Sequence, residues 1–157
     1  MRKIFRCRSN LKQKQKNNMS QYFTLEELLT SSTARQKSIE NLPSWEIVEH
    51  LKELADFLDE LRSAWGSGIR VSSGFRNEKL NKAVGGVPSS AHMCGYAADI
   101  VPINGKFDDF VKFIDKWSKD KAFDQIIIER SKNSRWVHIG LYNSYGKQRK
   151  MCFVMNV

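Results

Sequence analysis

The longest regular pattern of apolar and polar positions lies in the first half of the chain. Apolar residues recur there at steps of three and four, at Ile47, Leu51, Leu54, Ala55, Leu58, Leu61 and Trp65. This spacing puts the apolar side chains on one stripe of an amphipathic helix. Ser44 is a typical N-terminal cap and Gly66 a typical C-terminal stop, so a long helix is predicted between them.

Weaker patterns predict three further helices. Thr24 and Glu27 have the spacing of a capping box, and the short helix that they begin should end near the polar cluster at 30–33. A second short helix is expected over 77–84. The third is amphipathic, and its apolar positions are Phe107, Phe110, Val111, Ile114 and Trp117.

Segments of alternating or strongly apolar character predict the strands. They lie at 69–73, 97–103, 123–129, 135–141 and 151–157. Residues 131–134, Ser-Lys-Asn-Ser, have the composition of a hairpin loop, which makes their flanking strands antiparallel. Since helices mostly precede and flank these strands, the predicted fold class is α+β with a central antiparallel sheet.

Length and charge indicate one domain behind a basic tail. The chain has 157 residues and is 41% hydrophobic, enough for a single domain with a buried core, and no apolar run approaches the roughly 20 residues of a membrane span. Of the 26 basic residues, seven lie in residues 1–18, which contain no acidic residue. The domain, expected over 19–157, then carries 19 basic and 17 acidic residues. A nucleic-acid-binding role for it therefore loses its main support.

The tail does not have the pattern of an export signal. A secretory signal peptide needs an apolar stretch of about 7–15 residues after its charged start, whereas Phe5 is followed by arginines, lysines and glutamines. We therefore expect no signal peptide and a disordered tail. Cys7, Cys94 and Cys152 form no CxxC pair, and their odd number argues against a disulfide framework.

Two of the three histidines suggest a metal site. Together with Asp99, His92 and His138 supply two imidazoles and one carboxylate, a common ligand set of catalytic zinc, which leaves a fourth position open for water. With a zinc ion bound, two neutral imidazoles and one carboxylate leave the site positively charged. This charge lowers the pKa of bound water towards about 7. Cys94 lies near His92 but is interpreted as a small buried residue rather than a fourth ligand.

Glu129 is the candidate general base of such a site. If Glu129 pairs with Trp136 across the predicted hairpin, Ile127 pairs with His138. Glu129 and His138 then project from the same face of the sheet as diagonal neighbours, close enough for the carboxylate to reach an activated water. A register shifted by one residue would separate them, and Glu129 would then be a solvated charge at a strand end.

Candidate substrate contacts surround this group. Arg76 follows a predicted strand and could polarise a scissile carbonyl, stabilise its oxyanion or bind a substrate carboxylate. The residues alone leave these alternatives open, together with a plain surface ion pair. Ser90 could contact a ligand or shape its loop, and Tyr96 and Trp136 could line a cleft or serve in packing.

Three ordered motifs in this chain resemble those of a known family. They are Ser-Gly-Phe-Arg at 73–76, Ser-x-His-x-x-Gly-x-Ala-x-Asp at 90–99 and Trp-Val-His-Ile at 136–139. They are similar to motifs of the zinc D-alanyl-D-alanine carboxypeptidases. That superfamily also includes vancomycin-resistance D,D-dipeptidases and phage endolysin peptidases, and it shares its fold with the signalling domain of Hedgehog proteins. The resemblance runs from Tyr22 to Leu141.

The resemblance implies a Hedgehog/DD-peptidase-like fold and one zinc ion per chain, bound by His92, Asp99 and His138, with Arg76 contacting substrate. It implies a metallopeptidase that hydrolyses peptide bonds in peptidoglycan stem peptides, as a carboxypeptidase or as an endolysin-type endopeptidase. A phage enzyme of this kind stays in the cytoplasm until it is released, or travels with the virion, and acts on the cell wall. We expect a monomer.

One position departs from the family pattern. Several members carry the catalytic carboxylate three residues before the last histidine, where this chain has Arg135, whereas phage-type members resemble this chain in placing a glutamate where Glu129 lies. Arg135 favours an alternative function, a non-catalytic zinc-containing module that binds the cell wall or a partner. The complete ligand set and Glu129 favour the enzyme.

Overall fold

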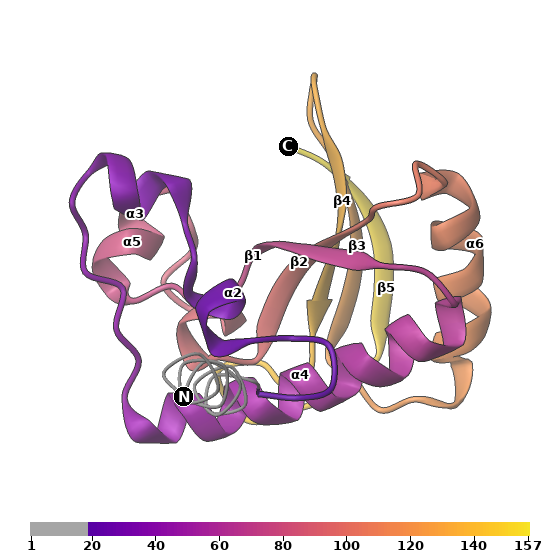
Figure 1. Cartoon of the computed structure of the whole chain (residues 1–157), viewed down its shortest axis with the longest axis horizontal. Helices are drawn as coiled ribbons and strands as arrows, with labels where there is room; N and C mark the ends of the chain where they lie inside the picture. The colour runs from indigo at the N-terminus through magenta and orange to yellow at the C-terminus, as the bar shows by residue number, and fades with distance from the viewer. Residues whose placement is uncertain (1–18) are drawn as a thin grey trace, which may run out of the picture.

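The computed structural model describes residues 19–157, so the predicted basic tail at 1–18 lies outside the described residues. The elements, shown in Figure 1, follow in the order α2 (Leu25–Leu29), α3 (Ser32–Gln36), α4 (Trp45–Trp65), β1 (Ile69–Ser73), α5 (Glu78–Ala83), the 3-10 turn η1 (Ala91–Cys94), β2 (Ala97–Pro102), α6 (Phe107–Trp117), the 3-10 turn η2 (Ser118–Asp120), β3 (Gln125–Arg130), β4 (Arg135–Gly140) and β5 (Met151–Asn156).

The long helix predicted from the apolar stripe is confirmed as α4. The Ser44 hydroxyl accepts a hydrogen bond from the Ile47 N–H, and Gly66 ends the helix with a φ of 76°, a left-handed conformation that favours glycine. The buried residues of α4 are Leu51, Leu54, Ala55, Leu58 and Leu61. None of the helices formed by residues 19–157 combines the length and the apolar composition that crossing a membrane requires.

The sheet confirms the α+β class but not the orientation of every strand. Its order is β1-β2-β4-β3-β5, and the first three neighbouring pairs are antiparallel. The last strand, β5, lies parallel to β3, so the sheet is mixed and the expectation of a wholly antiparallel sheet is wrong at this edge. The reason is the connection at 141–150, which carries the chain from the end of β4 around to the outer edge of β3. Gln125 opens β3 opposite both Gly140 and Met151.

An ion pair holds this connection against the start of β3. Arg149 donates hydrogen bonds from its side chain to both carboxylate oxygens of the buried Asp124, at 2.7 and 2.8 Å. The main-chain N–H of Arg149 donates to the same carboxylate at 3.2 Å. A bidentate pair of this kind fixes both distance and orientation, so it positions the first residue of β5 beside β3.

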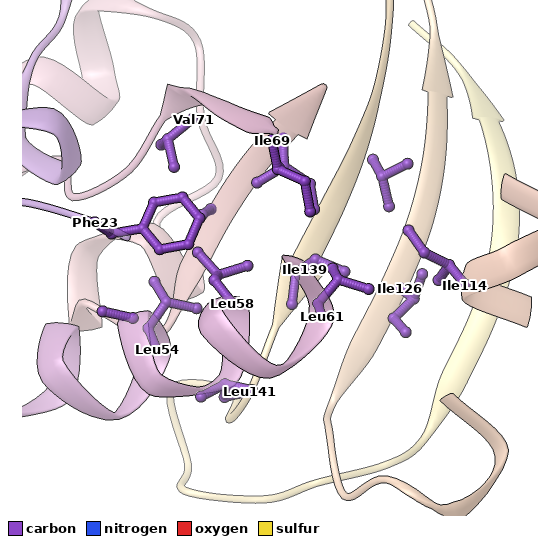
Figure 2. Close-up of a cluster of buried hydrophobic side chains, with 14 of the residues drawn as sticks. Phe23, Leu54, Leu58, Leu61, Ile69, Val71, Ile114, Ile126, Ile139 and Leu141 are labelled. Carbon is purple, nitrogen blue, oxygen red and sulfur yellow. The ribbon is translucent and has the colours of Figure 1, made fainter. Parts of the chain in front are cut away.

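The two faces of the sheet have different roles. One face packs against α4 and α6 and forms the core, as Figure 2 shows for the side chains of α4 pointing at the strands. Its strand residues are Ile69, Val71, Ala98, Ile100, Ile126, Ile128, Val137 and Ile139. Because side chains alternate along a strand, the intervening residues project from the opposite face. That second face carries Asp99, Ile127, Glu129 and His138.

A second short helix, α3, was not predicted. We expected one helix that ends near the polar cluster at 30–33, but Ser31 caps a new helix by accepting a hydrogen bond from the Ala34 N–H. Hydroxyl residues cap helices as readily as they end them, so the cluster was ambiguous in sequence. Ala34 packs with Ile39 and Leu80 in a small cluster of its own.

Asn41 ties this N-terminal region to the segment that follows β1. Its side-chain amide donates to the carbonyl oxygens of Leu29 and Phe75, and its side-chain oxygen accepts from the Asn77 N–H at 2.8 Å. These three hydrogen bonds join segments far apart in sequence on either side of Arg76. We therefore regard Asn41 as a structural support of the site that sequence patterns did not reveal.

Replacing Asn41 by alanine is expected to lower the free energy of unfolding by about 1–3 kcal/mol, because partly buried backbone groups lose their partners. Denaturant unfolding would measure the change. The matched control is Asn104→Ala, which removes one exposed turn hydrogen bond to the Lys106 N–H and should change stability by less than about 0.5 kcal/mol. Equal losses in both variants would contradict the supporting role of Asn41.

Candidate metal centre and active site

Three donor atoms converge on the face of the sheet opposite the core. His92 Nε2 and His138 Nδ1 lie 3.2 Å apart, His138 Nδ1 and Asp99 Oδ1 3.0 Å, and His92 Nε2 and Asp99 Oδ1 3.3 Å. In a tetrahedral zinc site with bonds of about 2.0–2.1 Å, neighbouring ligand atoms are separated by about 3.3 Å. The triangle therefore has the size and the donor chemistry of three corners of a zinc site.

Strand pairing brings two of the donors together. Asp99 on β2 and His138 on β4 are direct partners in the antiparallel pair, so their side chains leave the same face at closest approach. His92 comes from the 3-10 turn η1, which precedes β2. The Ser90 hydroxyl accepts a hydrogen bond from the His92 N–H at the start of η1, and Gly95 ends it with a φ of 73°.

The ring of His92 is held in one tautomer. Its Nδ1 lies 2.7 Å from the carbonyl oxygen of Gly74, which can only accept, so Nδ1 carries the proton and the lone pair of Nε2 faces the triangle. Burial lowers the pKa of His92, and this effect exceeds the opposing attraction of Asp99. The imidazole is therefore neutral near pH 7, the form that binds a metal.

Gly74 has a steric reason to be glycine. A Cβ atom at this position would collide with the carbonyl oxygen of Leu28, which accepts a hydrogen bond from the Phe75 N–H at 2.8 Å. The close approach of the two backbones holds Gly74, whose carbonyl oxygen lies within hydrogen-bond distance of His92 Nδ1. The place of Gly74 in the motif at 73–76 was visible in the sequence, but its contact with Leu28 of α2 was not.

Asp99 uses its two carboxylate oxygens differently. Oδ1 belongs to the triangle, and Oδ2 accepts a hydrogen bond from Arg76 at 3.2 Å. Burial alone would raise the pKa of Asp99, but its close contacts with His92 and His138 hold that pKa well below its ordinary value. The carboxylate is therefore ionised at neutral pH, as a metal ligand has to be.

Arg76 is held by two hydrogen bonds and has further N–H groups to donate. Its Nε donates to the Ser73 hydroxyl at 3.1 Å, and one terminal nitrogen donates to Asp99. Since a guanidinium has five N–H groups, three remain beyond these two contacts. Arg76 also lines the cavity above the triangle, where those groups can meet a ligand.

The predicted register of the hairpin is confirmed. Glu129 pairs with Trp136 and Ile127 with His138, so Glu129 lies diagonal to His138 on the same face. Burial and the charge of Asp99 raise the pKa of the half-buried Glu129, against the opposing effects of His138 and Arg76. The indole nitrogen of Trp136 is buried and has no hydrogen-bond partner among the described residues.

One cavity of about 830 Å³ contains these groups. It is lined by the triangle and by Arg76, Glu129, Trp136 and Ser90. Its remaining walls come from α3, from the loop at 84–87 and, on the far side, from β5. Seven of the eight site residues predicted from the sequence therefore line one cavity.

Tyr96 lies elsewhere. Its ring stacks on His50 of α4 with centroids 4.1 Å apart and packs against Tyr142 at 4.8 Å. It does not line the cavity, so the expected substrate contact at Tyr96 is not supported by its position. The left-handed turn at Gly95 directs the chain so that Tyr96 packs against the helix layer.

Some residues of the cavity were missed by sequence reasoning. They are Asp124 and Arg149, which pair with each other, and Phe153, Met155 and Val157 at the C-terminus. The alternating apolar positions of the last strand were visible, but their place beside the site depends on β5 lying parallel to β3.

A model of the peptidase M15 family matches residues 21–140. The chain belongs to this family. The match includes all three motifs and confirms the resemblance to the zinc carboxypeptidase group. M15 membership implies a metallopeptidase. Peptidases of this family depend on zinc, and the buried triangle of this chain could bind a metal ion. The M15 match ends at the last residue of β4, so β5 lies beyond it. No curated protein matches the chain in a sequence search.

Proposed function

We propose that this chain is a zinc metallopeptidase that hydrolyses peptide bonds in the stem peptides of bacterial peptidoglycan. The observation that carries the proposal is the donor triangle of His92, Asp99 and His138, with the Glu129 carboxylate on the same face of the sheet. A catalytic zinc site needs these two parts, a three-ligand set with an open position and a nearby base.

His92, Asp99 and His138 would hold the zinc ion. When bound, zinc supplies a Lewis acid that lowers the pKa of a water to about 7 and polarises a carbonyl. The protein's own contribution is to preset the donors. Gly74 fixes the tautomer of His92, and Arg76 fixes the orientation of Asp99, so that neither ligand has to rearrange on binding.

Glu129 would act as the general base and then as the general acid. Its carboxylate accepts a proton from the attacking water as the water oxygen bonds to the scissile carbon. The same proton passes to the leaving nitrogen as the carbon–nitrogen bond breaks. A pKa raised by burial suits both steps, because the group has to take up and release the proton in one cycle.

Arg76 and the cavity walls would bind the substrate. The three N–H groups of Arg76 that are not used by Ser73 and Asp99 suit a negatively charged oxygen, either the developing oxyanion or a substrate carboxylate. Ser90 and Trp136 line the same cavity. The Ser90 hydroxyl already caps η1, so its main effect is on the position of His92.

The position of Arg135 weakens the alternative of a non-catalytic binding module. Its guanidinium donates to Asp108 at 2.8 Å and stacks over the Phe107 ring at 4.6 Å, on the side of α6. Three positions separate Arg135 from His138, so the two side chains leave opposite faces of β4. Arg135 therefore does not occupy the site, and Glu129 remains the base that the cavity presents.

The choice of peptidoglycan rests on the motifs at 73–76, 90–99 and 136–139, which resemble those of cell-wall peptidases. Among these, the position of the glutamate favours the endolysin type, in which the enzyme reaches the cell wall after release from the cytoplasm or from the virion. The lining of the cavity includes residues of α3 and of the loop at 84–87 as well as residues of β5, which suits a peptide chain that is cut internally.

Removal of the metal is expected to stop the reaction. Protein dialysed against a chelator should release no new amino groups from purified cell walls, and stoichiometric zinc, but not magnesium, should restore the rate. Magnesium serves as the control because it prefers oxygen ligands in octahedral geometry. An unchanged rate after verified removal of zinc would contradict the mechanism. Zinc-loaded protein that binds walls without releasing amino groups would instead identify a binding module.

A further inference from the structure

The strand β5 adds one more residue to each row of paired side chains on the face of the sheet that carries the site. Asp99 pairs with His138, His138 with Ile127, and Ile127 with Phe153. Directly paired residues project from the same face. Phe153 therefore lies at the outer end of the row that begins at the donor triangle.

A second row runs beside the first. Trp136 pairs with Glu129, and Glu129 pairs with Met155. The general base thus has an aromatic neighbour on one side and Met155 on the other. Figure 1 shows β5 as the yellow strand next to β3, at the edge of the sheet.

The end of β5 presents apolar side chains to the cavity. Phe153, Met155 and Val157 all line it, and Met155 and Val157 are 40% and 59% exposed. Apolar surface of this kind gains about 25 cal/mol for each Å² that a ligand covers. This apolar surface and the donor triangle line the same cavity. A substrate bound at the triangle is therefore the ligand that covers the apolar surface.

The charged residues nearby are already paired. Asp124 and Arg149 line the same part of the cavity, but they bind each other through two short hydrogen bonds. As an ion pair they carry no net charge. The surface next to β5 therefore selects by apolar contact.

The spacing of the strands sets the reach of this surface. Neighbouring strands lie about 4.8 Å apart, so Phe153, two strands from His138, is about 10 Å away along the row. An extended peptide advances about 3.3 Å per residue, so this distance corresponds to about three residues. A dipeptide held at the triangle does not reach β5.

We propose that Phe153 and Met155 form an apolar subsite, which takes an aliphatic side chain of the substrate about three residues from the bond that is cut. The inference rests on the proposed peptidase function and adds a specificity determinant that lies outside the segment matched by the M15 family model. It requires a substrate longer than a dipeptide.

The test is a position scan with synthetic peptides. The probe is the shortest wall-derived peptide that the zinc-loaded wild type cleaves, extended with alanines at either end, with one leucine or one serine placed two, three or four residues from the cut. We expect kcat/KM to be roughly tenfold higher for leucine at one of these positions, the usual size of discrimination in an apolar pocket. Met155→Ser and Phe153→Ser should each reduce this preference.

Val154→Ser is the matched control. Val154 is on the same strand and 61% exposed, but it pairs with Ile128 and faces the side of α6. It should keep the leucine preference, which separates loss of the subsite from a weakened edge strand. Met155 is exposed enough for its variant to fold even if Phe153→Ser does not.

Two results would overturn the subsite. One is equal cleavage of leucine and serine peptides by the wild type at every position, and the other is a leucine preference that survives in both Phe153→Ser and Met155→Ser. In either case hydrolysis of cell walls would continue, so the proposed peptidase function would stand. A zinc-loaded wild type that cleaves neither walls nor peptides would instead remove the proposed function, and the subsite with it.

Discussion

Replacing His138 by alanine is expected to abolish both zinc binding and peptide hydrolysis. The Nδ1 atom of His138 is the shared corner of two short sides of the triangle, 3.0 Å from Asp99 and 3.2 Å from His92. Without it, two ligands remain, one of them already shared with Arg76. Since the metal lowers the barrier by several kcal/mol, the rate should fall at least about a thousandfold.

Zinc content by mass spectrometry and release of amino groups from cell walls measure the two effects separately. The wild type should carry one zinc per chain, and His138→Ala and His92→Ala should carry none. The control is His50→Ala, which removes the third histidine of the chain. His50 contacts the Cys94 carbonyl at 2.8 Å and stacks on Tyr96, outside the triangle.

His50→Ala should therefore keep its zinc and most of its activity, with only a loss of stability. Zinc retained in His138→Ala, or lost to the same extent in His50→Ala, would argue against the triangle as the metal site. The three variants can be compared directly because each replaces one histidine by alanine.

The local elements and the centre of the site could be predicted because they depend on short-range patterns. The apolar stripe and the caps at Ser44 and Gly66 define α4 within a continuous segment. The hairpin loop at 131–134 sets the register of β3 and β4, and this register alone places Glu129 and His138 on one face. Because side chains alternate between the two faces along each strand, this register also assigns the other residues of β3 and β4 to their faces.

The outer parts of the site could not be predicted because they depend on contacts between distant segments. The pairing of Arg149 with Asp124 holds the connection to β5 against the start of β3, and ion pairs of this kind have no signature in sequence spacing. The role of Gly74 depends on the approach of Leu28. For Tyr96 the sequence left open whether it lines a cleft or serves in packing, and only the structure shows it packed against His50 after the turn at Gly95.

Replacing Glu129 by glutamine is expected to lower kcat by about 10²–10⁴-fold while the protein keeps one zinc per chain. Glutamine has nearly the same shape but cannot accept a proton at neutral pH, so the change removes the base and leaves the triangle intact. Steady-state kinetics on cell-wall peptides and zinc analysis of the same samples would measure both effects. Asp108→Asn is the control, since that exposed carboxylate binds Arg135 on the other face of β4.

The pH profile distinguishes a base from a merely structural carboxylate. A base works only when ionised, so the wild-type rate should fall as the pH drops through the pKa of Glu129, which burial and the charge of Asp99 raise. The residual rate of Glu129→Gln should lack this acidic limb. An intact rate in Glu129→Gln, or an unchanged acidic limb, would mean that the proton is taken up elsewhere. Because Arg135 points to α6 and Asp99 is engaged by both histidines and Arg76, Glu129 is the carboxylate of the described cavity that remains available for this role.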